Sequence, residues 1–557
     1  MQSTCPHCSG TFTIEHADLD FIERISPVIA GKKHLIPPPT FCPTCRRQRR
    51  FTHRNEKRLY QRTCAKTGKP IISIYSPDKN LVVFDKTEWW GDGWDAKAHA
   101  KDIDFSRPFF EQLRELQTVV PRMALQQENN QNSDYTGNTS HLKNCYLIFS
   151  ADFDQDCAYG VWIERSKNCC DNLMIDECEQ SYECFFSKKL YRCRNALHCS
   201  QCSDSAFLFD CRNCQSCLMC WGLRNKKHCI ANVQYTKEEY EKRLKEFPLT
   251  SHKNYEAAKE QFAKLFAKAP RPAMRIQGTV IDSTGDLLSQ CQNCKDCYEL
   301  TEGKDCRYCA GAFKVVDAVD CNYFMGEFGY ENCECFPMPQ HSAFNMNSYG
   351  GSDLYYCDMC MLNCRDCFGC VGLKRGQYCI LNKQYTKNEY EALLPRLIDH
   401  MTKTGEWGQY VPAAMSLYAY NESQAQEEFP LTKKDATVKG WSWLDEEENN
   451  KSAGPAVPIP DDISDIDDTI CQQILRCEVT GKAYKIIPQE LTFYRDLGIP
   501  IPRRCFDQRH TDRITHRNPR QLWTRKCGKC SKEIQSTYDP KRPEVVLCEE
   551  CYLKMVY

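Results

Sequence analysis

Long apolar segments are missing from this sequence. No apolar run approaches the roughly 18 residues that a membrane helix needs, and the mean hydropathy is −0.61. The first residues, MQSTCPHCSG, lack the apolar core of a secretion signal and open directly into a Cys-x-x-Cys pair. We therefore expect a cytoplasmic protein without membrane segments, whose cysteines stay reduced. Such thiols bind metals or fill buried space as small, soft side chains.

The sequence also lacks an excess of charge and the motifs of common enzymes. Lys and Arg together number 73 against 74 Asp and Glu, so the whole chain is not a polycation. It contains no P-loop, no G-x-G-x-x-G, no H-E-x-x-H and no G-x-S-x-G. No nucleotide-binding or hydrolytic mechanism can be read from such a sequence, and we favour a non-enzymatic function.

Cysteine, in contrast, is abundant, with 40 residues in a chain of 557. A chain of this length is too long for one hydrophobic core, so several domains are expected. Basic residues gather in two segments, 41–70 and 503–530, which align without gaps and are copies of one module. The alignment places Cys42, Arg46, Arg50, Arg54 and Cys64 on Cys505, Arg509, Arg513, Arg517 and Cys527.

Each copy of this module has room for two four-cysteine sites and has kept a different one. Paired Cys-x-x-Cys motifs with a short spacer are typical of structural zinc sites, so both ends resemble zinc ribbons. The lost sites keep only Cys64 in the first copy, and Cys477 with Cys505 in the second. We expect two zinc ions, one at Cys5, Cys8, Cys42 and Cys45, the other at Cys527, Cys530, Cys548 and Cys551.

The arginines of the duplicated segment are candidate phosphate ligands. A zinc-fixed backbone would hold several guanidiniums on one face, where RNA, DNA or a ribonucleoprotein would bind. The alternative is a solvated face whose charges balance an acidic linker. The candidates are Arg46, Arg47, Arg49, Arg50, Arg54, Arg509, Arg513 and Arg517.

The middle of the chain follows a twelve-residue period. Every twelfth position from Cys145 to Cys229 is Cys or Ser, and the column four residues later is large and apolar, from Phe149 to Val233. Stacked identical positions are typical of a solenoid. A twelve-residue coil would enclose no core, so we expect two units in each coil, about 24 residues. The step recurs from Cys297 to Cys379.

Eight array cysteines are possible additional metal ligands, because the ends of the two arrays are near copies that both keep them. Most array cysteines are better explained as buried small side chains, with zinc or an iron–sulfur cluster as alternatives. These eight residues are Cys214, Cys217, Cys220, Cys229, Cys364, Cys367, Cys370 and Cys379.

We therefore expect a mainly β protein with α-helices: a two-part parallel β-solenoid with capping helices, flanked by small zinc-ribbon modules. Helices are predicted at 104–120, after Thr236 and after Thr386, the latter two with Thr N-caps and acidic first turns. The expected parts are a zinc-ribbon module at 1–100, a helical cap at 101–135, solenoid halves at 136–235 and 281–385, a helical connection at 236–280, a helical segment at 386–419, an acidic linker at 420–470 and a second zinc-ribbon module at 471–557.

This layout resembles an uncharacterised bacterial group of cysteine-rich proteins flanked by zinc ribbons, a resemblance that implies no activity. Three functions stay open. The first is a non-enzymatic zinc protein that binds nucleic acid or serves as a scaffold. The second is a redox or metal-handling protein that uses the array thiols. The third is a solenoid enzyme acting on a polysaccharide, which would need clustered carboxylates on one outer face.

Overall fold

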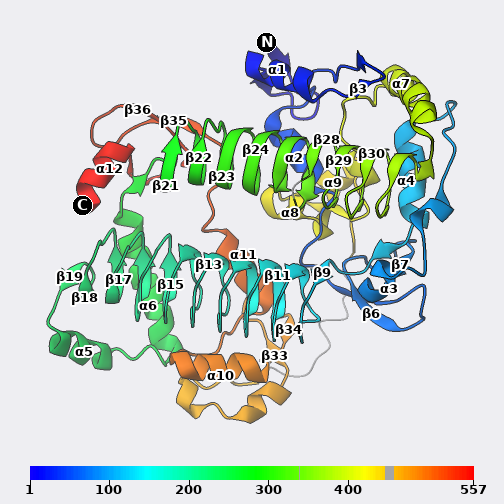
Figure 1. The fold of residues 1–557 in the computed structure, drawn as a ribbon. Coiled ribbons are helices and arrows are strands. Elements are labelled where there is room, and N and C mark those ends of the chain that lie inside the picture. Colours follow the sequence, from blue (N-terminus) through cyan, green and yellow to red (C-terminus); the bar gives the residue numbers. More distant parts are fainter. Residues whose placement is uncertain (338, 446–456) are drawn as a thin grey trace.

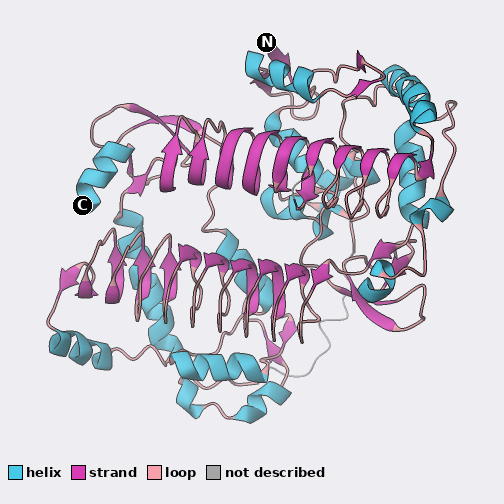
Figure 2. Ribbon diagram, viewed as in Figure 1, coloured by secondary structure: helices cyan, strands magenta, loops and turns pink. Residues whose placement is uncertain are grey.

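Two long parallel sheets dominate the protein, which is mainly β with additional helices. The computed structural model describes residues 1–337, 339–445 and 457–557. The first sheet has 11 strands, from β9 to β19, and the second has 12, from β21 to β32. The two sheets lie one above the other in Figure 1, with helices and small sheets around them (Figure 2).

Strands of the first sheet follow one another in chain order, and only the last pair, β18 and β19, is antiparallel. Its strands are β9 (Gln127–Glu128), β10 (Gly137–Ser140), β11 (Tyr146–Asp152), β12 (Ala158–Glu164), β13 (Leu173–Asp176), β14 (Phe185–Lys188), β15 (Arg194–Leu197), β16 (Ala206–Phe209), β17 (Gln215–Trp221), β18 (Lys227–Ile230) and β19 (Val233–Gln234).

The second sheet repeats this plan and also ends in an antiparallel pair, β31 and β32; β25 and β27 pair beside its main path. Its strands are β21 (Ile276–Ile281), β22 (Gly285–Gln292), β23 (Cys297–Arg307), β24 (Ala310–Val319), β25 (Asn322–Phe324), β26 (Gly326–Tyr330), β27 (Cys333–Cys335), β28 (Gln340–Ala343), β29 (Ser352–Tyr355), β30 (Arg365–Phe368), β31 (Gln377–Ile380) and β32 (Lys383–Gln384).

Helices and short strands occupy the ends of the chain and the connections. The helices are α1 (His16–Ile25), α2 (Pro43–Phe51), α3 (Lys86–Trp90), α4 (Phe109–Val119), α5 (Lys237–Glu246), α6 (His252–Lys268), α7 (Lys387–Lys403), α8 (Gln424–Glu428), α9 (Lys433–Val438), α10 (Pro488–Leu497), α11 (Phe506–Ile514) and α12 (Glu549–Val556). The short strands are β1 (Gln2–Thr4), β2 (Thr11–Thr13), β3 (Val28–Ile29), β4 (Lys32–Lys33), β5 (Tyr60–Thr63), β6 (Pro70–Ser73), β7 (Val83–Phe84), β8 (Arg122–Met123), β20 (Arg271–Pro272), β33 (Leu475–Arg476), β34 (Ala483–Tyr484), β35 (Trp523–Lys526), β36 (Glu533–Ser536) and β37 (Val546–Leu547).

Neighbouring strands of the first sheet pair with a twelve-residue offset, as the sequence period predicts. Phe149 pairs with Val161, and Val161 pairs with Leu173. Isolated parallel bridges keep the same offset three and six residues earlier in the chain, for example Ala158 with Cys170 and Gln155 with Lys167. The chain therefore returns to the same position every twelve residues, so the expected 24 residues in each coil is wrong.

Every third residue of the first array points inward, and most of these side chains are small, with Ile and Leu at some positions. Cys145, Ile148 and Ala151 begin this series, and all are buried in one continuous core. The residue just before an inward position commonly has a positive φ, as at Asn144 and Leu147. A single left-handed residue between extended ones turns the chain sharply. Twelve residues can therefore form one complete turn of the array, with four short straight segments joined by four corners.

Cysteine suits this narrow interior because its thiol is small and donates a weak hydrogen bond. Cys157 Sγ, for example, lies 3.3 Å from Gln155 O and 3.6 Å from Ser166 O, which are the two acceptors within reach of its one hydrogen. The 24-residue prediction assumed that twelve residues enclose no core. Thiols, methyl groups and small polar side chains fill the space instead.

The large apolar column lies on the outside of the first array and is covered there. Phe149, Val161, Leu173, Phe185, Leu197 and Phe209 are buried in a cluster that includes Phe262 and Phe266 of α6 and Phe506 of α11. The column is thus a docking face for helices rather than the filling of a coil.

The predicted helices form, but one packs in an unexpected place. α5 and α7 begin after Thr236 and Thr386, each with a capping box, and contact the last parallel strand of their own sheet. α4, expected at the start of the first array, instead buries Phe109 and Phe110 against Tyr356, which follows β29 of the second sheet. None of the helices in the described ranges combines the length and apolar character of a membrane span.

The predicted acidic linker, 420–470, is partly structured. It contains α8 and α9, and Ile463, Ile466 and Ile470 are buried against α10. Residues 446–456 lie outside the described residues.

One interior acid yields a test of this packing. Asp154 is 1% exposed, and its Oδ1 accepts a hydrogen bond from Ser166 N at 2.8 Å, whereas its Oδ2 has no partner among the residues that the structure describes. Burial raises the pKa of Asp154 to about 8. Asn172 fills a similar inward position and satisfies both ends of its amide, accepting from Cys184 N and donating to Ser181 O.

We expect Asp154→Asn to raise the free energy of unfolding by about 1–3 kcal/mol at pH 8.5 and by less at pH 5. Because burial raises the folded pKa of Asp154 from 3.8 to about 8, the wild-type carboxyl between these two pH values is protonated in the folded protein and ionised in the unfolded chain. Stability is therefore lost as the pH rises from about 4 towards 8. Urea unfolding at both pH values measures the difference; an equal effect at both would contradict the assigned pKa.

Candidate metal centres and arginine helices

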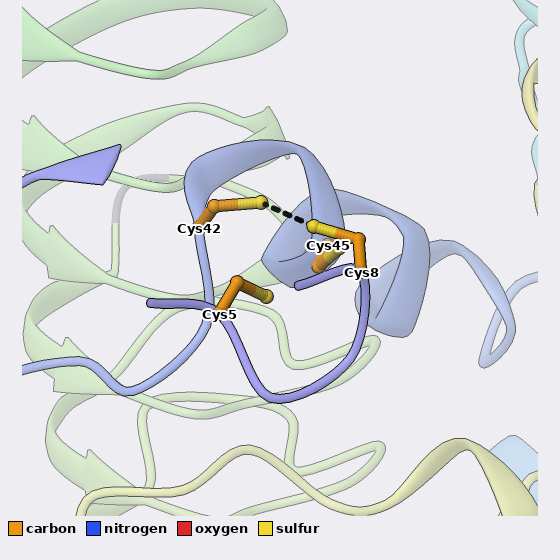
Figure 3. Close-up of side chains that lie close together, drawn as sticks. All are labelled: Cys5, Cys8, Cys42 and Cys45. Carbon is orange, nitrogen blue, oxygen red and sulfur yellow. Dashed lines mark hydrogen bonds between the residues drawn. The ribbon is translucent and has the colours of Figure 1, made fainter. Parts of the chain in front are cut away.

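The N-terminal tetrad joins a hairpin turn to the start of a helix. Cys5 and Cys8 lie in the turn between β1 and β2, while Cys42 is the N-cap of α2 and Cys45 lies in its first turn. Figure 3 shows the four side chains pointing toward one another. Their Sγ atoms all lie within 4.8 Å of one another, and Cys8 Sγ is 3.8 Å from Cys42 Sγ.

The C-terminal tetrad has the same construction. Cys527 and Cys530 lie in the turn between β35 and β36, Cys548 is the N-cap of α12 and Cys551 follows in that helix. These four Sγ atoms also lie within 4.8 Å of one another, with 3.7 Å between Cys530 and Cys548. Both predicted ligand sets are thus brought together, and either could hold a metal ion.

Backbone amides prepare the sulfur atoms for a cation. In the C-terminal tetrad, Cys548 N donates to Cys527 Sγ at 3.3 Å. Burial alone would raise the pKa of Cys527, but amides including those of Cys530 and Cys548 outweigh it and lower this pKa to about 6. Thiolates are the form in which cysteine binds metals.

The two lost sites keep their shape without their ligands. Asp85 N donates to Cys64 Sγ at 3.3 Å, as Cys548 N does to Cys527 Sγ. In the other copy, Thr480 Oγ1 lies 3.9 Å from Cys505 Sγ. The described ranges contain no third group of Cys, His, Asp or Glu placed for a metal.

The eight array cysteines proposed as additional ligands do not converge in this way. All are buried inside the arrays, and all eight thiols donate to backbone carbonyls nearby in the chain, as Cys220 does to Leu218 O at 3.2 Å. They occupy the interior positions described above.

The arginines of α2 are buried against the second sheet instead of facing solvent. Asp320, after β24, binds Arg46 at 2.5 Å and Arg50 at 3.1 Å. Glu331, after β26, binds both Arg49 and Arg50 at 3.1 Å. Arg47 Nε donates to Glu428 of α8 at 2.8 Å, and Arg54, beyond the end of α2, pairs with Glu56.

The arginines of α11 are buried against the first sheet in the same way. Asp171, before β13, accepts hydrogen bonds from both Arg509 and Arg513. Arg509 also reaches Glu490 of α10 at 3.4 Å. Arg517 alone among the eight predicted phosphate ligands is only half-buried.

These contacts correct the placement expected for the arginines: seven of them are buried, and each of the seven pairs with a carboxylate. The acidic partners of these arginines were not predicted from the sequence. A signal was present, because two arginines four residues apart kept in both copies are unusual on a solvated face. It could not identify Asp171 or Asp320, which lie hundreds of residues from the arginines they bind.

Comparison with protein-family models and with curated proteins finds no match for this chain.

The buried ion pairs predict an asymmetry between two aspartates of the second array. Asp320→Asn should lower the free energy of unfolding by about 3–5 kcal/mol, because it leaves two buried guanidiniums underpaired. Asp317→Asn is the matched control: its partner Arg24 is 54% exposed, so the cost should stay below about 1 kcal/mol. Urea unfolding of both variants gives the comparison, and similar costs would mean that the contacts at Asp320 add no more than a surface pair.

Proposed function

We propose that the protein is a non-enzymatic zinc-binding scaffold, in which two structural zinc ions hold terminal modules that clamp a two-part β-solenoid. The convergence of two cysteine tetrads carries this proposal. A tetrahedral zinc ion with bonds of about 2.3 Å to sulfur separates its sulfur atoms by about 3.8 Å. The Sγ atoms of Cys8 and Cys42 lie 3.8 Å apart, and those of Cys530 and Cys548 lie 3.7 Å apart.

The solenoid part of the proposal rests on the twelve-residue register and the interior series of small side chains. Both arrays stack their units on one neighbour before and one after, which gives an elongated body with extended faces. Such a body needs covered ends. α5 and α7 lie beside the last strands of the two arrays and serve this purpose.

The terminal modules dock crosswise. The N-terminal helix α2 binds the second array through Asp320, whereas the C-terminal helix α11 binds the first array through Asp171. Glu428 of α8 joins the two modules, because it accepts from Arg47 at 2.8 Å and from Arg520 at 2.6 Å. A zinc ion at Cys42 would fix the start of α2 and so the position of its arginines.

The alternatives gain less support. Array thiols that donate to carbonyls inside a closed core are poorly placed for a redox role. Binding of RNA or DNA was expected through arginines that are buried and paired, so it has no part in this proposal. A polysaccharide enzyme would need a carboxylate cluster free of basic partners, whereas Asp171, Asp320 and Glu331 all bind arginine.

Metal analysis of the purified protein tests the proposal. We expect two zinc ions per chain, and one after replacement of Cys548 and Cys551 by serine, because two thiolates cannot complete a tetrahedral site. The matched control replaces Cys477 and Cys505, the remnant of a lost site, and should leave two zinc ions. Wild-type protein without zinc, or zinc content unchanged by the first double replacement, would overturn the assignment.

A further inference from the structure

A cavity of about 420 Å³ lies between the first array, α6, α11 and the segment that precedes α11. This volume lies within the roughly 300–1,000 Å³ typical of small-molecule sites. One wall is apolar and largely aromatic. Phe185 and Phe207 contribute to it from the array, and Phe262 and Phe266 from α6.

Arg513 also lines the cavity, and its buried guanidinium is only partly satisfied. Arg513 is 2% exposed, and its Nη1 donates to Asp171. Its Nε and Nη2 have no hydrogen-bond partner in the described part of the chain, although buried donors almost always have one. These two atoms form one edge of the guanidinium, which matches two oxygens of a carboxylate or phosphate.

The duplicated module shows what this edge lacks. Arg50, the counterpart of Arg513, uses all three nitrogens: Nε donates to Asn322 at 2.8 Å, Nη2 to Asp320 at 3.1 Å and Nη1 to Glu331 at 3.1 Å. Around Arg513 only the aspartate remains. Leu173 stands two residues after Asp171, where Asn322 stands two residues after Asp320.

The second carboxylate is present near Arg513 but is engaged elsewhere. Glu183 lies one unit beyond Asp171, as Glu331 lies one unit beyond Asp320, because Tyr182 pairs with Cys170 and Tyr330 with Val319. Glu183 instead binds Lys259 of α6 at 2.9 Å and accepts from Asn195 at 2.7 Å. Arg513 therefore lacks the second carboxylate partner that Arg50 has in Glu331, and it lines a cavity instead.

We propose that this cavity binds a small aromatic oxyanion, with its charged group on the Nε–Nη2 edge of Arg513 and its ring against the phenylalanine wall. Arg503, which also lines the cavity and whose Nε has no partner among the described residues, adds a second cation. The acidic lining residues do not oppose an anion, because each pairs with Lys259 or Arg504. These residues are Glu183, Glu256, Glu478 and Asp512.

Titration calorimetry with four probes tests the ligand class. 1-Naphthoate and 1-naphthyl phosphate carry both a ring and an oxyanion, inorganic phosphate carries only the oxyanion, and 1-naphthylmethanol carries only the ring. We expect at least one naphthyl anion to bind ten times more tightly than the other two probes. The tighter of the two anions distinguishes a carboxylate site from a phosphate site. No binding of either anion, or equal binding of phosphate or the alcohol, would overturn the proposal.

Two variants place the binding in this cavity. Arg513→Lys keeps a cation for Asp171 but removes the two-nitrogen edge, and Ala263→Trp fills the cavity from α6; each should weaken anion binding at least tenfold. Lys264→Trp, on an exposed neighbouring residue that does not line the cavity, is the control for a new tryptophan on α6 and should bind as the wild type does. Wild-type affinity in both cavity variants would place binding elsewhere and refute the site. The metal content of each variant reports separately on the zinc modules, on which this inference does not depend.

Discussion

The structure depends on two buried aspartates that each bind two arginines. Asp320 and Asp171 stand at turns of the two arrays, and both are fully buried. A charge in such a position is tolerated only when it is paired and hydrogen-bonded. Because the arginine partners come from helices at the chain ends, satisfying the aspartates forces α2 and α11 onto opposite arrays. The crosswise arrangement of the molecule follows from this requirement.

The arrays explain why so much cysteine is present without a matching number of metal sites. Four side chains must share the interior of each twelve-residue turn, so space there is limited, and polar side chains need hydrogen-bond partners. A thiol meets both conditions, because it is small and reaches nearby carbonyl oxygens, as Cys193 does with Tyr191 O and Cys202 O. Asn172 meets them differently, by bridging successive turns with its amide.

The sequence predicted the twelve-residue register, both cysteine tetrads and the helices after Thr236 and Thr386, because each of these is a local pattern. It failed on the size of the turn, since positive φ at residues such as Leu147 leaves no mark in the sequence. The surroundings of the arginines were also out of reach. Arg50 and Asp320 are neighbours only because the whole second array brings them together, and no period or spacing links them.

The two module copies separate the roles of metal and ion pair. The copy around α11 has lost the tetrad beside its arginine helix, yet Arg509 and Arg513 still dock on Asp171. Ion pairing therefore holds such a helix without a metal. The retained C-terminal tetrad lies at the start of α12 and not beside α11. Tyr552 of α12 donates to Asp210 of the first array at 2.5 Å. The strand before this helix, β37, pairs with β20. Loss of a metal bound there would release the end of the chain from the first array while α11 stayed in place. At the N-terminus, a metal bound by Cys42 and Cys45 would instead act on the same helix as the arginines.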